Sequence, residues 1–213
     1  MTGLDLIQGT DEWRQARVGS LGASCVADVV AKTKTGYGAS RANRMAAMII
    51  ERLTGDEQDY YQNAAMLHGI NTEPEARLAY EFMRGVEVAQ VGLVKHPRIE
   101  GTHASPDGLI GDDGVLEIKC PQSAAHIEVL LTGRIPEKYA TQMMWQLACT
   151  GRKWADFVSY SPRFPEEMRL FVKRLPRVDA RIEELEKEVS LFLAELAGKV
   201  SELRQLYSMA EAA

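Results

Sequence analysis

The 213-residue chain has no apolar segment long enough to cross a membrane, and its N-terminus lacks the charged-then-apolar pattern of a secretory signal. These two absences predict a cytoplasmic protein with no membrane partner. Cysteine is scarce as well: Cys25, Cys120 and Cys149 are odd in number and show no C-x-x-C spacing. We therefore expect free thiols in a reducing compartment, and neither a disulfide framework nor a cysteine-based metal site.

Positive charge is not in excess either. The chain has 25 Lys and Arg against 30 Asp and Glu, a formal net charge of −5 at pH 7. This balance argues against a generally basic nucleic-acid coat, although it still allows one confined basic groove. A candidate basic region lies near the N-terminus, and its members are Arg14, Arg17, Lys32, Lys34, Arg41, Arg44 and Arg52. For each of them a solvated surface of mixed charge is the alternative interpretation.

The apolar residues follow an α/β pattern, and a chain of this length can bury a sizeable core. Helices are expected after Thr10, from Ser24 to about Lys32, from Ser40 to Leu53, up to Met83, from Ser123 to Leu131 and from Pro136 to Gly151. Strands are expected over residues 86–94, 115–120, 155–160 and 169–174. The pattern predicts a central mixed β-sheet flanked by helices.

The C-terminal region is a long amphipathic helix by its spacing. Between Val178 and Leu206, apolar residues recur at three- and four-residue steps. We therefore divide the chain into a main domain, 1–176, and a C-terminal helix, 177–213. The apolar stripe can pack on the body or lie at a subunit interface, and the last residues, 209–213, are expected to fray.

Two short segments carry most of the functional information: Ser105-Pro106-Asp107-Gly108 and Glu117-Ile118-Lys119-Cys120-Pro121. Residues two apart in a strand point to one face, so Glu117 and Lys119 project together. Residues 111–114, Gly-Asp-Asp-Gly, are a strong turn signal. A hairpin closed there brings Asp107 close to the position opposite Glu117.

Two carboxylates and a lysine at this spacing suit metal-dependent cleavage of a phosphodiester. Hard cations such as Mg²⁺ prefer carboxylate oxygens, and a bound metal acidifies water and offsets charge on the leaving oxygen. Lys119 would orient the attacking water or neutralise the developing charge. An ordinary surface hairpin with a Glu/Lys pair is the alternative, because Glu-X-Lys alone is common.

These segments resemble the active site of the phage lambda exonuclease family, the alkaline exonucleases of phage recombination in the PD-(D/E)XK nuclease superfamily. The likeness runs from about Gly9 to Tyr160 and also includes Trp13–Gly19, Gly22-Ala23-Ser24, Gly69 with Glu73, and Tyr139 with Gln142. It implies a restriction-endonuclease-like core and a 5′→3′ exonuclease that acts on duplex DNA ends. Such an enzyme releases 5′-mononucleotides and leaves 3′ single strands. The resemblance also implies a homotrimeric ring and a single-strand annealing protein as a partner.

The resemblance further implies roles for individual residues. Asp107, Glu117 and the main-chain carbonyl of Ile118 would hold Mg²⁺, with two ions per site and Mn²⁺ as a substitute. Lys119 would activate water and Gln142 would position it, with Gln146 as a second amide on the same helix face. Glu73 matches an active-site acid near the metals. From the residues alone, Glu73 before Pro74 is equally typical of an acid in the first turn of a helix.

An end-phosphate pocket is also implied. Arg17, Ser24 and Ser105 would hold the terminal 5′-phosphate, with Lys34 as a further DNA contact. From the residues alone, Ser24 can simply cap a helix and Arg17 can pair with a surface acid. Where the family has another phosphate-binding Arg, this chain has Ala124-Ala125-His126. His126 either substitutes for that Arg or is a plain histidine on a helix surface.

Two other functions stay open at this point. One is a PD-(D/E)XK endonuclease, which would cut within a duplex. The other is a non-cleaving subunit that binds DNA ends.

Overall fold

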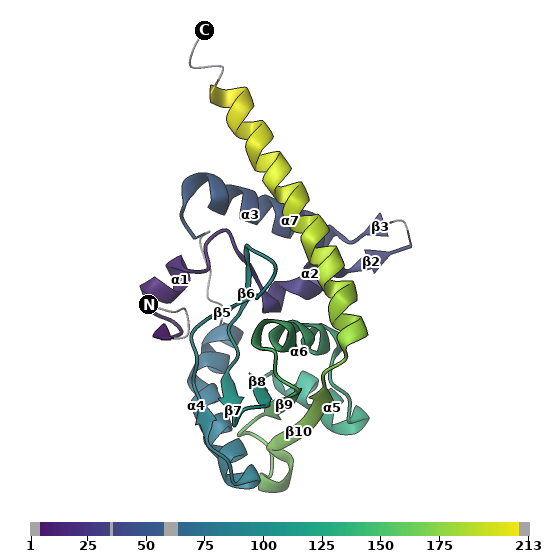
Figure 1. Ribbon diagram of the computed structural model, residues 1–213. Helices are drawn as coiled ribbons and strands as arrows, with labels where there is room; N and C mark the ends of the chain where they lie inside the picture. The colour runs from purple at the N-terminus through teal and green to yellow at the C-terminus, as the bar shows by residue number, and fades with distance from the viewer. Residues whose placement is uncertain (1–4, 35, 58–63, 209–213) are drawn as a thin grey trace.

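The computed structural model describes residues 5–34, 36–57 and 64–208 (Figure 1). Its centre is a five-stranded sheet in the order β10-β9-β8-β7-β4. The strands are β4 (Val88–Ala89), β7 (Gly108–Ile110), β8 (Gly114–Lys119), β9 (Trp154–Tyr160) and β10 (Leu170–Pro176). Strands β8 and β9 are parallel and the other neighbouring pairs are antiparallel, so the sheet is mixed, as predicted.

Helices cover both faces of this sheet, which confirms the predicted α/β architecture. Leu116 and Ile118 of β8 pack with Tyr80 of α4 (Ala64–Arg84). The alternate residue Val115 belongs to the core on the other side, together with Met143 of α6 (Glu137–Thr150). The two-residue period of β8 therefore sends Glu117 and Lys119 to the α6 side.

The hairpin β7–β8 closes as the turn signal predicts. Gly108 lies opposite Leu116 in the register, so Asp107 reaches the position next to Glu117. Gly111, with φ of 49°, supplies the left-handed conformation of the turn. Gly114 allows a close approach, because a Cβ there would lie 2.2 Å from the indole of Trp154.

Two smaller sheets accompany the main one. The first has the order β1-β6-β5, from β1 (Leu21–Gly22), β6 (Thr102–Ala104) and β5 (Val94–Lys95). The second is a hairpin of β2 (Lys32–Thr33) and β3 (Gly36–Tyr37). The remaining helices are α1 (Asp11–Gln15), α2 (Val26–Val30), α3 (Ala39–Thr54), α5 (Ser123–Thr132) and α7 (Asp179–Ser208), with 3₁₀ turns η2 (Ala23–Cys25) and η3 (Glu166–Met168).

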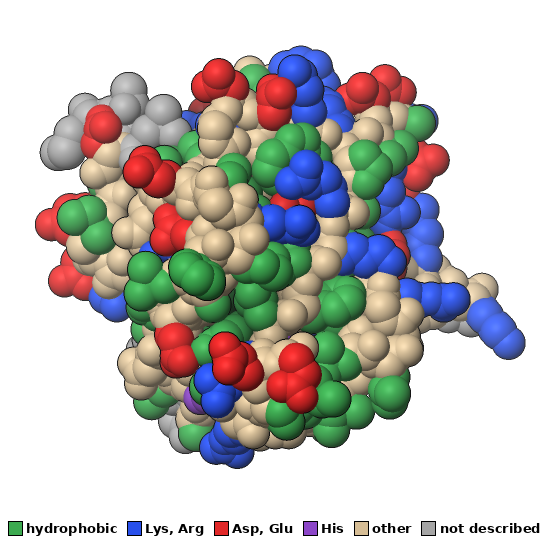
Figure 2. Space-filling view, turned by 90° about the horizontal axis from the view of Figure 1, so that it is seen from below, with side chains coloured by type: hydrophobic (Ala, Val, Ile, Leu, Met, Phe, Trp, Pro, Cys, Tyr) green, Lys and Arg blue, Asp and Glu red, His purple; other side chains and the backbone are tan. Residues whose placement is uncertain are grey.

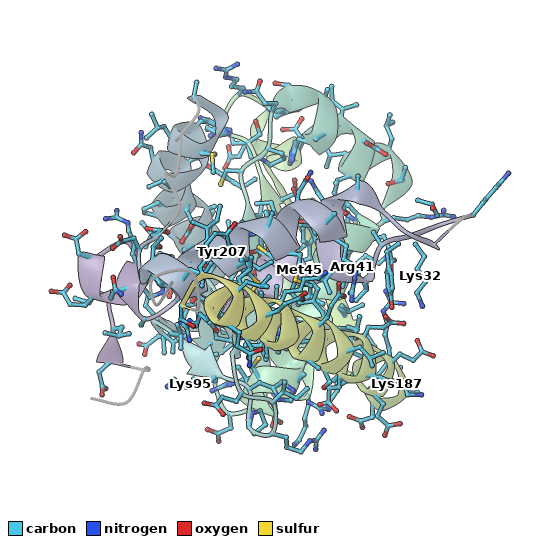
Figure 3. All side chains as sticks on the ribbon, turned by 90° about the horizontal axis from the view of Figure 1, so that it is seen from above. Lys32, Arg41, Met45, Lys95, Lys187 and Tyr207 are labelled. Carbon is cyan, nitrogen blue, oxygen red and sulfur yellow. The ribbon has the colours of Figure 1, made fainter. Side chains whose placement is uncertain are left out.

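The long helix α7 packs on the body over most of its length. Its side chains from Ile182 to Val200 contribute to the main core, and it contacts α2, α3 and α6. Arg41 and Met45 of α3 lie between α3 and α7 (Figure 3). Beyond Val200 the helix projects past the body (Figure 1), and Leu206 and Tyr207 are exposed. The expected fraying of 209–213 lies outside the described residues.

Helix ends were predicted with mixed success. Thr10 caps α1 by accepting the N–H of Trp13, and Gly55, Gly133 and Gly151 end their helices in the left-handed conformation. Ser24 as a cap is wrong, since it lies inside η2 and α2 ends at Val30 before β2 begins.

Two further boundaries also differ from the prediction. Ser40 lies within α3, whose N-cap is Gly38, and donates to the carbonyl of Asp28 at 2.9 Å. The expected strand 86–94 is wrong as one element. It divides into β4 and the start of β5, which belong to different sheets.

All three cysteines are free thiols, as expected. None of the helices in residues 5–34, 36–57 and 64–208 combines the length and the apolar character that a membrane crossing requires.

Candidate active site

The hairpin β7–β8 brings the two carboxylates and the lysine together. Asp107 precedes β7, and its Oδ2 accepts the main-chain N–H of Ile118 at 2.6 Å. Glu117 is fully buried in β8, and its Oε1 forms an ion pair with Lys119 Nζ. The three side chains therefore converge as predicted. They lie within 12 positions of one another along the chain.

Helix α6 supplies two amides to the same carboxylate. Gln142 Nε2 donates to Glu117 Oε1 at 2.6 Å, and Gln146 Nε2 donates to Glu117 Oε2. Both glutamines are buried, and they lie one turn apart on the helix face that meets the sheet. The amides and Lys119 together fix the orientation of Glu117.

The charges at this cluster do not balance. Burial and the nearby Glu117 carboxylate raise the pKa of Asp107 well above its usual range, against the opposing charge of Lys119. Burial alone would lower the pKa of Lys119, but the Glu117 and Asp107 carboxylates outweigh it and raise that pKa. Lys119 is therefore an ammonium ion at neutral pH, and two acids share it.

The donor set fits a divalent cation. Asp107, Glu117 and the carbonyl of Ile118 offer hard oxygens, the ligand type that Mg²⁺ prefers. The pKa of Asp107 is raised by burial first and by the negative charge of Glu117 second, and a bound cation would offset both effects. Within the described residues, no three His, Cys, Asp or Glu side chains are placed to hold a metal by themselves. The main-chain carbonyl and water would therefore have to complete the coordination.

Glu73 reaches the cluster from the middle of a helix. It lies within α4 and is followed by Pro74, which the helix accommodates in its interior. The interpretation of Glu73 as a first-turn acid is therefore wrong. Burial raises the pKa of Glu73, while the charges of Arg77 and Lys119 lower it and that of Glu117 raises it. Because the charges of Lys119 and Glu117 affect the pKa of Glu73, its side chain lies near the β7–β8 hairpin.

A large cavity opens beside the cluster. Its volume is about 1220 Å³, and α1, η2, α3 and α4 contribute to its walls. Asp107, Glu73, Arg17 and Ser24 all line it. Two acids of the site, Asp107 and Glu73, and two of the three residues assigned to the 5′-phosphate thus face one space, whereas Glu117 is buried and does not line it.

The other DNA-contact predictions are placed differently. Ser105 is not among the cavity-lining residues, but its Oγ accepts from Trp13 Nε1 at 3.2 Å, and Trp13 lines the cavity. Lys34 is exposed beside the turn of the β2–β3 hairpin and is also absent from the lining. The role of Lys34 in DNA binding stays a prediction.

The N-terminal basic region does not form one surface. Arg14, Arg17 and Arg44 line the cavity, whereas Lys32 and Arg41 pair with Glu188 and Glu195 of α7. The face of the molecule seen from below carries patches of both charges (Figure 2). Positive potential is therefore local, as the net charge suggests.

Sequence reasoning missed Arg77. It lies on α4, lines the cavity and donates from Nη2 to Glu73 Oε1 at 2.5 Å. Its Nε is buried without a hydrogen-bond partner in the described part of the chain, as is the Nε of Arg44. The spacing of four residues from Glu73 was the signal that could have revealed this pair.

His126 takes neither of the two roles considered for it. It is fully buried on α5, with Nδ1 2.8 Å from Ser159 Oγ and Nε2 2.8 Å from the carbonyl oxygen of Met168. Its ring also contacts Phe164 edge-on. Both ring nitrogens are engaged inside the protein, so His126 joins α5 to β9 and η3 and is not available to a phosphate.

Replacing His126 with alanine should therefore lower stability and leave end recognition unchanged. The loss of two buried partners is expected to cost about 2–4 kcal/mol of the free energy of unfolding. Urea denaturation would measure that cost. The preference for 5′-phosphorylated over 5′-hydroxyl DNA, measured on the folded variant, should equal that of the wild type; a lost preference would return His126 to the pocket.

A mixed sheet that carries Asp107 and the Glu117-Ile118-Lys119 triplet on one hairpin, under two glutamine amides, defines a nuclease with a PD-(D/E)XK-like fold. The chain belongs to the YqaJ-like viral recombinase domain family, whose sequence profile matches residues 12–153. This match confirms the resemblance to the phage lambda exonuclease family. Nucleases of this kind generally depend on a divalent metal.

Solved structures agree with the family. The chain is similar to LHK-Exo, an alkaline exonuclease from Laribacter hongkongensis, with 48% identity, a TM-score of 0.88, and coverage of 96% of this chain and 100% of that one. The structure of LHK-Exo with dAMP matches with the same values. A phage-related exonuclease from Haemophilus somnus 129PT shares the fold at 13% identity and a TM-score of 0.68, over 86% of this chain and 96% of that one. No curated protein matches the sequence.

Proposed function

We propose that the protein is a Mg²⁺-dependent 5′→3′ exonuclease of double-stranded DNA ends. It releases 5′-mononucleotides and leaves 3′ single strands for annealing recombination. One observation carries the proposal: Asp107, Glu117 and Lys119 converge beside a cavity that Asp107 and Arg17 both line. The relative LHK-Exo is an alkaline exonuclease whose structure with dAMP is known, and it supports the same kind of activity here.

The roles of the acidic residues follow from their oxygens. Asp107, Glu117 and the Ile118 carbonyl would hold Mg²⁺, two ions per site, and Mn²⁺ would serve as a substitute. When bound, the metal supplies an acidified water and polarises the phosphate. Glu73 would assist from α4, held in place by Arg77.

The other side chains orient and neutralise. Because its pKa is raised, Lys119 faces the site as an ammonium ion. In this role it orients water and stabilises negative charge on the phosphate. Gln142 and Gln146 hold Glu117 through both carboxylate oxygens, and the amide oxygen of Gln142 would position a water.

The pocket for the 5′-phosphate would contain Arg17, Ser24 and Ser105, with Lys34 further along the DNA. Arg17→Ala should erase the preference for 5′-phosphorylated over 5′-hydroxyl duplex ends, because a guanidinium pairs with phosphate through charge-assisted hydrogen bonds. Initial rates on the two duplexes would measure the ratio. Arg134→Ala, an exposed arginine outside the cavity lining, is the matched control. An unchanged ratio in Arg17→Ala would remove the pocket from the proposal.

One digestion tests activity, polarity and end requirement together. A linear duplex labelled separately at each end is incubated with Mg²⁺, with Mn²⁺, and with a chelator. The proposal expects label to leave the 5′ ends as mononucleotides only when a metal is present. Release from the 3′ ends would contradict the polarity, and no release at all would favour the non-cleaving end-binding subunit.

A DNA substrate without ends distinguishes the exonuclease from the endonuclease alternative. A covalently closed circular duplex has no end, so the exonuclease should leave it intact while it degrades the linear form. Comparable cutting of both forms would establish the endonuclease instead.

The assembly is likewise a proposal. We infer that three full-length chains form a ring and that residues 1–176 of each chain are its nuclease domain. The ring would act in the cytoplasm together with a single-strand annealing protein. Sedimentation equilibrium of the purified chain tests the trimer, and a monomer across the working concentration range would contradict it.

A further inference from the structure

A buried histidine contacts the arginine assigned to the end phosphate. His103 lies on β6, the central strand of the β1-β6-β5 sheet, and is only 2% exposed. Its Nδ1 is 2.8 Å from Ser20 Oγ, and its Nε2 accepts from Arg17 Nε at 3.4 Å. Gly22 is the register partner of His103 on β1, and a Cβ there would come within 3.3 Å of His103 Nε2. The imidazole is thus closely confined.

The contact with Arg17 defines the tautomer of the ring. An arginine Nε–H can only donate, so His103 Nε2 must be the acceptor. The proton of a neutral imidazole then sits on Nδ1 and is donated to Ser20 Oγ. Burial, and secondarily the charge of Arg17, lower the pKa of His103 to about 3. The ring therefore stays neutral, and it keeps its acceptor toward Arg17 at any pH near neutrality.

A second aromatic residue holds the same guanidinium. The Arg17 guanidinium carbon lies 4.1 Å from the centroid of the Trp13 ring, a cation–π geometry. Trp13 is fixed in turn, because its Nε1 donates to the Gly92 carbonyl at 2.9 Å and to Ser105 Oγ at 3.2 Å. Trp13 contacts the face of the guanidinium and His103 contacts its Nε. Neither of these two contacts uses the terminal amino groups, which can form an end-on fork with a phosphate.

We propose that His103 is a positioning residue that, together with Trp13, presets the Arg17 guanidinium for the terminal phosphate of DNA. The inference rests on the proposed end-phosphate pocket and extends it to a residue that does not line the cavity. An arginine side chain loses much rotamer freedom when it is fixed. Fixing it during folding removes that cost from the binding step, so the benefit appears in substrate affinity and end discrimination.

The test uses two variants of His103 in the full-length protein. His103→Phe keeps an aromatic ring and removes the acceptor, whereas His103→Gln keeps a side-chain oxygen that can accept. For His103→Phe we expect the ratio of kcat/KM for 5′-phosphorylated over 5′-hydroxyl duplex to fall about tenfold, the size of one lost hydrogen bond. The change should appear in KM, with kcat within about twofold of the wild type. His103→Gln should retain most of the wild-type ratio.

A matched control is available in the same small sheet region. His96 is also buried, but it contacts Glu186 and stacks on Trp145, away from Arg17. His96→Phe is expected to change the melting temperature and to leave the end-discrimination ratio at the wild-type value. Equal losses of the ratio in His96→Phe and His103→Phe would show a general packing effect and overturn the proposal.

The outcomes also separate this inference from the pocket itself. If Arg17→Ala erases the preference and folded His103→Phe does not reduce it, the pocket stands and the role of His103 is refuted. If Arg17→Ala leaves the preference intact, the pocket fails first and the inference falls with it. Should His103→Phe not fold, Ser20→Ala is the deciding variant. It removes the half-buried hydroxyl that contacts His103 Nδ1. A reduced ratio in Ser20→Ala supports the proposal, and an unchanged ratio overturns it.

Discussion

Replacing Lys119 with alanine should lower kcat by at least about 10²-fold while DNA binding persists. Lys119 is the only cation paired with Glu117 in the described structure, and its pKa is raised by the two carboxylates beside it. Its loss would remove the positive charge that we propose faces the scissile phosphate. The DNA contacts assigned to Arg17 and Ser24 come from other elements, so affinity for the duplex should remain.

Single-turnover digestion and a gel-shift titration of the same preparation measure the two quantities. Lys138→Ala is the matched control, because Lys138 and Lys119 lie 4.6 Å and 5.3 Å from the centroid of the Tyr139 ring, and Lys138 is exposed. The control should retain wild-type turnover. Removing one partner of a buried ion pair is destabilising, so melting curves must show that Lys119→Ala is folded at the assay temperature. Near-normal turnover in that folded variant would exclude Lys119 from the mechanism.

Asp107→Asn should have opposite effects on activity and on stability. The amide oxygen of asparagine can still accept the N–H of Ile118, but the carboxylate that would hold the metal is lost. We expect turnover in Mg²⁺ to fall by at least about 10²-fold and heat released on Mn²⁺ titration to disappear. In a chelator, however, the melting temperature should rise, because a buried negative charge beside Glu117 has been removed.

The pH dependence of the metal-free protein gives a second readout of Asp107. Its carboxyl binds a proton more readily in the folded state than in the unfolded chain, where its ordinary pKa is 3.8. The stabilisation this provides is complete below pH 3.8 and is lost as the pH rises through the higher folded pKa. The melting temperature of the wild type should therefore fall across that window more than that of Asp107→Asn. Each kcal/mol of the free energy of unfolding corresponds to about 2–4 °C in melting temperature for a chain of this size.

Asp113→Asn is the control for this prediction. Asp113 lies in the turn of the same hairpin and pairs with Lys153 at 2.9 Å on the surface. Its replacement should leave metal binding, turnover and the pH profile of the melting temperature close to those of the wild type. If Asp107→Asn behaves like this control, Asp107 neither binds the metal nor carries the buried charge.

Much of the catalytic hairpin could be derived from the sequence because its geometry is local. The two-residue period of a strand places Glu117 and Lys119 on one face, and the turn at Gly111 sets Asp107 beside Glu117. Chain spacing alone determines these relations. The alternative of Glu73 as a first-turn acid is wrong because it also depends on local spacing: Pro74 is a common signal for a helix start, and the packing of α4 on β8 overrides it.

The sequence by itself thus determined the mixed α/β architecture, the acid-acid-lysine hairpin and the family, since strand period, turn residues and motif order act over a few positions. The resemblance already named Gln142 and Gln146, but only the tertiary structure decided which groups the distant side chains contact. Gln142 and Gln146 reach Glu117 from α6, His126 turns inward to Ser159, and His103 meets Arg17 across 86 positions of the chain. Such contacts depend on how whole elements pack against one another, which no local spacing specifies.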